Sequence, residues 1–228
     1  DYKEIEENHE VRIRSNILIN RLKESNSLNK KICEVGIGAG DVTLRLAPIC
    51  NDMISIDMSN DNIENAKKRL IEKNIKLPRF INADITKFNS EEKFERIILL
   101  GLLEHIKDPI PFLKTIRNQL SSDGVIHIAV NLHHSLHRIL SVEMGMLEKT
   151  SELSSRDIEL GHYIVYDQQT LRNQIDEAGY QIIYEDLHYL KPFPSSFMKD
   201  FSIEVHDALC ILGRKYPDFA SYIYLEIK

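Results

Sequence analysis

The sequence predicts an α/β fold: a Rossmann-like, doubly wound, mostly parallel sheet of seven strands with helices on both faces, plus a small helical cap and insertion. Three observations support this prediction. Short β-type runs alternate with helical stretches over the first 130 residues, and a glycine-rich turn follows the first run. The run at 96–100 is almost wholly apolar, as expected for a parallel strand buried on both faces.

The elements of the first half follow in order. A helix is expected over 10–23, because its apolar residues recur at helical spacing. The first strand, 31–35, stops at glycines, and the helix from 41 to 47 ends before Pro48. The remaining elements are strands at 53–57, 79–82, 96–100 and 125–130, and helices at 60–73 and 110–120, with a turn at Asp123 and Gly124.

The alternation lapses after residue 130. Residues 131–167 read as a His-rich helical insertion, and 168–178 as a helix capped by Gly179. Two last strands, 181–185 and 208–213, would complete the seven. The stretch from residue 215 onward receives no assignment.

Size and composition narrow the class of protein. The 228 residues suffice for one α/β domain, and 43% apolar and 28% charged residues are ordinary for a globular protein. We expect a single domain over 1–228, with an N-terminal helical cap at 1–28 and a substrate-side insertion at 131–167.

The charge and the cysteine content limit which partners and which cellular compartment we expect. The net charge of −6 does not favour binding to nucleic acid. No apolar run is long enough to cross a bilayer, so no membrane partner is expected. Three cysteines without a metal-type cluster read as free thiols in the cytoplasm. The oligomeric state, monomer or homodimer, stays open.

The most informative segment is E-V-G-I-G-A-G-D at 34–41, between a strand and a helix. Glycines there let the backbone turn sharply and approach a ligand, with helix N–H groups facing it. The dinucleotide fingerprint G-x-G-x-x-G would need a glycine where this chain has Asp41. The spacing E-x-G-x-G-x-G instead resembles the first motif of class I S-adenosylmethionine (SAM)-dependent methyltransferases, of the type that acts on small molecules.

The resemblance extends over roughly the first 130 residues. Asp57 ends the second strand, where the family binds the ribose hydroxyls, and Asp84 follows the third, where it places an acid near adenine. Residues 100–109, L-G-L-L-E-H-I-K-D-P, resemble its L-E-H-x-x-D-P signature. The resemblance implies S-adenosyl-L-methionine as cofactor, bound by Glu34, Gly36, Gly38, Gly40, Asp57, Met58, Asp84, Ile85, Gly101, Leu102 and His105.

Each of these residues also has an ordinary structural explanation. The glycines could form only a tight turn, and Asp57 could be a helix N-terminal acid or a solvated strand end. Asp84 could be a turn or cap residue together with Thr86. His105 could cap a helix without taking part in chemistry.

Candidates for the acceptor side lie in the insertion, where the family usually builds its acceptor pocket. His133 and His137 would share one face if this stretch is helical. Residues 161–167 resemble a G-H-x-x-x-Y/F stretch of small-molecule methyltransferases, which singles out His162. Strand ends form the ligand crevice of such sheets, so the predicted catalytic residues are Asn131, His133 and His162. A metal site formed by His133, His137 and His162 is not expected, because no carboxylate motif accompanies them.

Two further groups of residues carry expectations. The first helix, with Tyr2, His9, Arg12 and Arg14, resembles the family's mobile cap over the cofactor. Arg138, Arg156 and Lys191 could clamp an anionic acceptor or could be surface charges.

The sequence thus predicts an enzyme that transfers a methyl group from SAM to an oxygen or nitrogen of a small-molecule acceptor, with natural products and cell-surface saccharide or phosphate groups among the candidates. A nicotinamide-dependent oxidoreductase on a similar sheet is the alternative, opposed by the glycine spacing. A non-catalytic SAM-binding module would carry the same cofactor motifs. Methylation of nucleic acid is not favoured, because residues 101–104 do not carry the N-P-P-Y signature of base-methylating enzymes.

Overall fold

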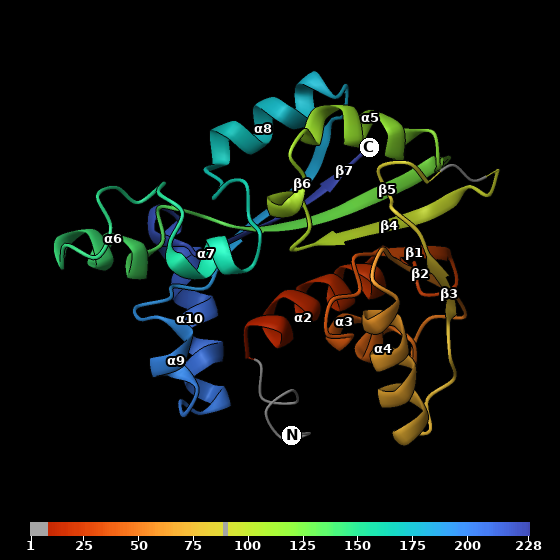
Figure 1. The fold of residues 1–228 in the computed structure, drawn as a ribbon, viewed down its shortest axis with the longest axis horizontal. Helices are drawn as coiled ribbons and strands as arrows, with labels where there is room; N and C mark the ends of the chain where they lie inside the picture. Colours follow the sequence, from red (N-terminus) through yellow and green to blue (C-terminus); the bar gives the residue numbers. More distant parts are fainter. Residues whose placement is uncertain (1–8, 89–90) are drawn as a thin grey trace. The chain divides into compact units, whose positions relative to one another are not determined.

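The computed structural model describes residues 9–88 and 91–228 (Figure 1). These residues form two compact units. Unit 1 comprises the described residues up to 100, together with 112–127 and 228; unit 2 comprises 101–111 and 128–227. Tyr2 and the start of the predicted cap lie outside the described residues. The expectation of one domain over 1–228 stays a prediction.

Unit 1 is built from parallel strands and three helices. Its elements are α2 (His9–Glu24), β1 (Lys31–Val35), α3 (Asp41–Leu46), β2 (Asp52–Asp57), α4 (Asn60–Glu72), β3 (Arg79–Asn82) and β4 (Phe94–Leu100). The pairs β1/β2, β1/β4 and β2/β3 are parallel. Helices α2, α3 and α4 lie together on one side of β1–β3 (Figure 1). Apolar residues on these elements, such as Leu18, Ile54 and Leu70, are fully buried, so each helix packs its apolar face into the core.

Unit 2 holds the insertion and the last two strands. Its elements are the short helix η1 (Leu103–His105), α6 (Leu136–Glu143), α7 (Ser155–Glu159), α8 (Gln168–Glu177), β6 (Ile182–His188), α9 (Ser195–Met198), α10 (Ile203–Lys215), η2 (Pro217–Phe219) and β7 (Tyr222–Ile227). Strands β6 and β7 are antiparallel. Asp167 caps α8 by accepting a hydrogen bond from the Thr170 N–H at 2.8 Å. Gly179 follows the helix at φ +83°, which confirms the predicted cap.

The strands follow the order β3-β2-β1-β4-β5-β7-β6 in one seven-stranded sheet. Helix α5 (Pro109–Arg117) and strand β5 (Leu120–Asn131) contribute residues to both units. The predicted α/β class and the seven strands of mixed, mostly parallel direction are confirmed.

The predicted strand at 208–213 is wrong, because these residues lie in helix α10. A short apolar run fits a strand or a helix, and spacing alone does not separate them. Gly213 lets α10 approach the chain just after β6: a Cβ there would lie 2.2 Å from the Tyr189 backbone nitrogen. The seventh strand is β7, in the stretch left unassigned, and all six of its residues are buried.

The turn predicted at Asp123 and Gly124 falls within the span of β5. Helix α5 ends at Arg117, short of the predicted 120, and β5 already begins at Leu120. Gly124 lies within the strand, where a Cβ would come within 2.4 Å of the Leu120 side chain. An extended strand would separate residues 120 and 124 by about 13 Å, so the chain bends sharply at the first residues of β5, where the turn was predicted.

Two further properties bear on the predicted class. None of the helices in the described part of the chain is long and apolar enough to span a membrane. Cys33, Cys50 and Cys210 are free thiols, and Cys33 is buried.

Candidate functional site

The glycine loop follows β1 in unit 1. Gly36, Gly38 and Gly40 have φ values of +79°, +54° and +84°, a region that other residues rarely adopt. A Cβ on Gly40 would lie 2.9 Å from the Ala66 Cβ, so α4 packs directly on this glycine. Nothing lies within 4 Å of a Cβ built on Gly38, so the backbone there faces open space. The loop can therefore approach a ligand, as predicted.

Asp57 ends β2 beside this loop and holds it. One carboxylate oxygen, Oδ2, accepts hydrogen bonds from the N–H groups of Ile37 at 2.7 Å and Gly38 at 3.2 Å. The other, Oδ1, accepts from the Ser59 N–H at 2.8 Å and from Asn62 Nδ2 at 3.3 Å. The structure thus brings Asp57 and the glycine loop together at the carboxyl edge of the parallel strands, where such sheets bind ligands.

A buried ion pair that the sequence did not reveal clamps the same loop. Arg69 of α4 donates through Nη2 to Asp41 Oδ1 at 2.7 Å and through Nη1 to the Ala39 carbonyl. The Arg69 and Asp41 side chains are only 6% and 15% exposed. Asp41, which replaces the third glycine of a dinucleotide fingerprint, therefore serves to fix the loop. The one signal in the sequence was a charged residue where that fingerprint has glycine.

Glu34 has its contacts inside unit 1. Its Oε2 accepts from Thr43 Oγ1 at 2.7 Å and Ser55 Oγ at 2.8 Å, so it joins β1 to α3 and β2. Burial raises the pKa of Glu34 to about 7. Its Oε1 is buried without a hydrogen-bond partner among the described residues. A direct contact between Glu34 and a cofactor stays a prediction.

Two arginines lie near each other where α2 meets α3. Arg45 donates to Asn16 Oδ1, and Arg12 lies one helical turn before Asn16 on the same face of α2. Burial, and then the neighbouring charge of Arg12, lower the pKa of Arg45. The two positive charges therefore lie close enough to repel each other.

The remaining predicted residues of unit 1 lie after β2 and β3. Met58 is 76% exposed, and Ile85 is buried. Asp84 accepts from the Thr86 N–H at 3.0 Å and the Thr86 hydroxyl at 2.6 Å, and these bonds lower the pKa of its carboxyl. This is the ordinary turn geometry that the sequence left open for Asp84.

In unit 2, Glu104 joins the stretches that the sequence singled out. Its side chain is 1% exposed, and Oε1 accepts from the Asn131 N–H at 3.4 Å. Its carbonyl accepts from the Tyr163 N–H at 2.8 Å. Gly101, at φ +65°, donates its N–H to the Ala129 carbonyl at 2.8 Å. The segment from Gly101 through Leu102 to His105 therefore lies beside the end of β5 and the loop before α8.

His162 and His105 form the centre of a polar cluster. Their rings meet edge to face with centroids 4.6 Å apart. His162 Nδ1 lies 3.2 Å from Asp157 Oδ1, and Arg138 Nη1 lies 3.0 Å from Asp157 Oδ2. Burial, and then the neighbouring His162, lower the pKa of His105. Sequence reasoning missed Asp157, which lies five residues before His162.

His133 does not lie in a helix, although one was considered for this stretch. Helix α6 begins at Leu136, so His133 and His137 do not share a helical face, and that expectation is wrong. His133 Nδ1 is 3.0 Å from Thr150 Oγ1, and its Nε2 is 3.8 Å from Asp167 Oδ2. Burial and the adjacent His134 lower its pKa.

The three candidate cations have other partners or are exposed. Arg138 is buried in the cluster, Arg156 pairs on the surface with Glu159 at 2.7 Å, and Lys191 donates to Ser195 Oγ at 2.8 Å. Among the residues described, no three His, Cys, Asp or Glu side chains are arranged to hold a metal ion.

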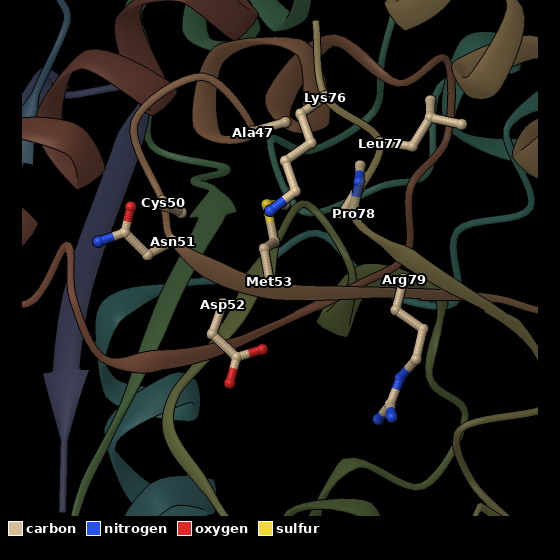
Figure 2. A pocket seen from close by; sticks show the side chains of 9 residues that line it. All are labelled: Ala47, Cys50, Asn51, Asp52, Met53, Lys76, Leu77, Pro78 and Arg79. Atoms are coloured by element: carbon tan, nitrogen blue, oxygen red, sulfur yellow. The ribbon is translucent and has the colours of Figure 1, made fainter.

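A separate hollow of about 200 Å³ lies at the amino ends of β2 and β3 (Figure 2). Its lining residues are Ala47, Cys50, Asn51, Asp52, Met53, Lys76, Leu77, Pro78 and Arg79. In Figure 2 the Asp52 and Arg79 side chains extend to one side of the strands, away from Lys76 and Leu77. This is the edge of the strands opposite Asp57, so the hollow is not part of the glycine-loop site.

Comparison with known proteins identifies the family. A family model described as a methyltransferase domain matches residues 7–185, most of the chain. The chain belongs to the class I SAM-dependent methyltransferases.

Individual relatives of this methyltransferase cover less of it. Ubiquinone biosynthesis O-methyltransferase of Haemophilus ducreyi is 26% identical over 129 residues, 54% of each chain. (S)-Coclaurine N-methyltransferase of Papaver somniferum is 36% identical over 76 residues, 33% of this chain and 21% of that one. The chain therefore spans about half the length, or less, of these two relatives. Magnesium protoporphyrin IX methyltransferase of Synechocystis, solved with S-adenosylhomocysteine (SAH), shares the fold: the TM-score is 0.66 at 14% identity, over 96% of this chain and 83% of that one.

Proposed function

We propose that this methyltransferase transfers the methyl group of SAM to an oxygen or nitrogen of a small molecule. The observation that carries the proposal is the glycine loop, open at Gly38 and held by Asp57 at the carboxyl edge of β1 and β2. The relatives' names include both O- and N-methyltransferases of small molecules, which supports this class of acceptor.

The residues present fit the cofactor. A Cβ at Gly38 would fill the open space over the loop, so the site needs glycine there. The two oxygens of Asp57 already accept four hydrogen bonds, so a ribose diol would replace the longer ones, from Gly38 and Asn62. The proposed cofactor contacts also include Met58, Asp84, Ile85, Gly101, Leu102 and His105.

SAM supplies an electrophilic methyl group bound to a sulfonium, and the protein must align an acceptor with it and exclude water. We assign this acceptor side to Asn131, His133 and His162. Support comes from contacts within unit 2, where Glu104 bonds the Asn131 N–H and the Tyr163 N–H, and the His133 N–H bonds the Tyr166 carbonyl at 2.8 Å. Three free thiols favour a reducing compartment, so we propose that the enzyme works in the cytoplasm.

The experiment that tests the proposal is thermal unfolding with SAM, SAH, NAD and NADP in parallel. A ligand present at about 100 times its dissociation constant stabilises the folded state by roughly 2.7 kcal/mol. We expect an upward shift with SAM and SAH only. A shift with a nicotinamide dinucleotide alone would favour the oxidoreductase alternative.

A further inference from the structure

The outer face of helix α10 in unit 2 is apolar although it is exposed. Six large apolar side chains on the helix and just after it are each more than a third exposed: Ile203, Val205, Ile211, Leu212, Tyr216 and Phe219. The inner face carries the buried residues His206 and Gly213. His206 Nδ1 lies 2.7 Å from the Tyr189 hydroxyl, and its Nε2 lies 3.2 Å from the Met198 carbonyl oxygen. These contacts fix which face of α10 points outward.

The size of this apolar surface matches one side of a protein interface. With about 200 Å² for a whole large side chain, the exposed fractions of the six residues amount to roughly 600 Å². That is the upper end of the range of about 300–600 Å² for the largest apolar patch of a typical monomer. Each partner of a standard interface contributes about 800 Å². The six side chains and the surface of α10 around them are therefore enough for one side of a stable contact.

A stripe along the middle of the outer face has the spacing of a helix–helix contact. It consists of Glu204, Ala208, Ile211 and Lys215, which are all exposed and follow one another at intervals of four, three and four residues. Such intervals bring side chains to one side of a helix, as along the seam of paired helices. The stripe has a small and a large apolar residue at its centre and charges of opposite sign at its two ends.

This stripe is complementary to a second copy of itself in the antiparallel direction. A two-fold axis midway between Ala208 and Ile211 places the large residue of each copy against the small residue of the other. Glu204 and Lys215 lie equally far from that midpoint, so the same axis places each of them opposite its counter-charge on the second copy. A parallel arrangement would instead bring like charges together, which is unfavourable.

We propose that this protein forms a homodimer through α10, with the two copies of the helix antiparallel about an axis between Ala208 and Ile211. The apolar face supplies most of the affinity. The two Glu204–Lys215 pairs at the rim determine the direction of pairing, because exposed ion pairs add little energy but select the partner and its register. The proposal concerns assembly only and stands independently of the acceptor that the enzyme methylates.

The first experiment is sedimentation velocity of the protein over a range of micromolar concentrations. We expect the wild type to form a dimer. Ile211→Asp should raise the dissociation constant of the dimer at least about 100-fold, because a two-fold interface carries the change twice and each carboxylate meets apolar surface. Ile71→Asp on α4 is the matched control, since Ile71 is 64% exposed and Ile211 is 54% exposed. The control should dimerise as the wild type does.

The second experiment exchanges the two charges. Glu204→Lys and Lys215→Glu should each weaken the dimer about 10-fold at low ionic strength, because each places like charges opposite each other twice. Combining both substitutions in one chain restores opposite charges at both places. The affinity of the double variant should therefore return to within about threefold of the wild type. Added salt should reduce the differences between these variants.

A wild type that stays monomeric throughout would overturn the proposal, as would a dimer that Ile211→Asp leaves as tight as Ile71→Asp does. Single charge variants without effect, or a double variant as weak as the single ones, would contradict the antiparallel pairing. Circular dichroism checks that each variant is folded. Glu204 and Lys215 are exposed on the separate copy, so the charge exchange still decides the question if Ile211→Asp does not fold.

Discussion

At the residue scale, we expect cofactor binding to depend most on Asp57. Its two oxygens accept four hydrogen bonds, two of them from the glycine loop. In the proposed site, this carboxylate would bond both the loop and the cofactor, and would therefore couple the shape of the loop to binding. The side chain is 7% exposed, so its loss removes both the acceptor and part of the support for the loop.

We therefore expect Asp57→Ala to raise the dissociation constant for SAH roughly 10- to 100-fold, because hydrogen bonds to a charged group contribute about 1.5–3 kcal/mol. Calorimetric titration of SAH measures the change. Asp61→Ala, on the exposed surface of α4, is the matched control. Equal affinity in Asp57→Ala and wild type would remove Asp57 from the cofactor site.

Arg69 is the second residue that determines the loop. It lies 28 residues from Asp41 in the chain, and both side chains are largely buried. Removing one partner of a buried ion pair leaves a charge without compensation, which costs about 3–5 kcal/mol.

Arg69→Met should accordingly lower the free energy of unfolding by about 3–5 kcal/mol, as measured by urea denaturation. Adding Asp41→Asn should restore part of the loss, because the unpaired carboxylate is then gone. A single variant as stable as the wild type would show that the pair does not hold the loop.

At the element scale, the packing of α10 against the chain after β6 depends on Gly213. The backbone nitrogen of Tyr189 and the carbonyl carbon of His188 would lie 2.2 Å and 2.6 Å from a Cβ at this position. Backbone atoms cannot yield as a flexible side chain does, so the helix would have to move.

Gly213→Ala is expected to destabilise the protein by about 1–3 kcal/mol, the usual cost of overpacking, although alanine favours helix. Lys215→Ala, exposed on the same helix, serves as control. Thermal unfolding monitored by circular dichroism checks both. If Gly213→Ala is as stable as Lys215→Ala, the close approach of α10 is wrong.

At the scale of the whole molecule, Glu34 links stability to pH. Burial raises its pKa to about 7 from an ordinary value near 4.5. The folded state then binds more protons than the unfolded chain between these values. Its contribution to stability is fully present below about pH 4.5 and is lost as pH rises through about 7.

Glu34→Gln removes this titration while keeping an oxygen for Thr43 and Ser55. We expect the unfolding free energy of the variant, relative to the wild type, to rise between pH 5 and pH 7.5. Urea denaturation of both proteins across this range measures the difference in unfolding free energy. The contributions of the other titrating groups cancel in this difference. A constant difference would mean that Glu34 does not titrate there in the folded state.

The sequence was informative where function depends on local backbone. Gly36, Gly38 and Gly40 require positive φ, and Asp57 ends a strand whose edge is set by the alternation of elements, so both could be predicted. Arg69 and Asp157 could not, because their roles arise from tertiary contacts rather than from spacing. The apolar run at 208–212 suits a strand or a helix, and only packing at Gly213 decides it.

The central claim is that the cofactor binds at the glycine loop, and hydrogen exchange with and without SAH tests it most directly. The account predicts slower amide exchange at 36–41 and 57–59 when SAH is saturating, with no change at 76–79, which lines the hollow at the opposite strand edge. Unchanged exchange at the loop, or protection confined to 76–79, would contradict it.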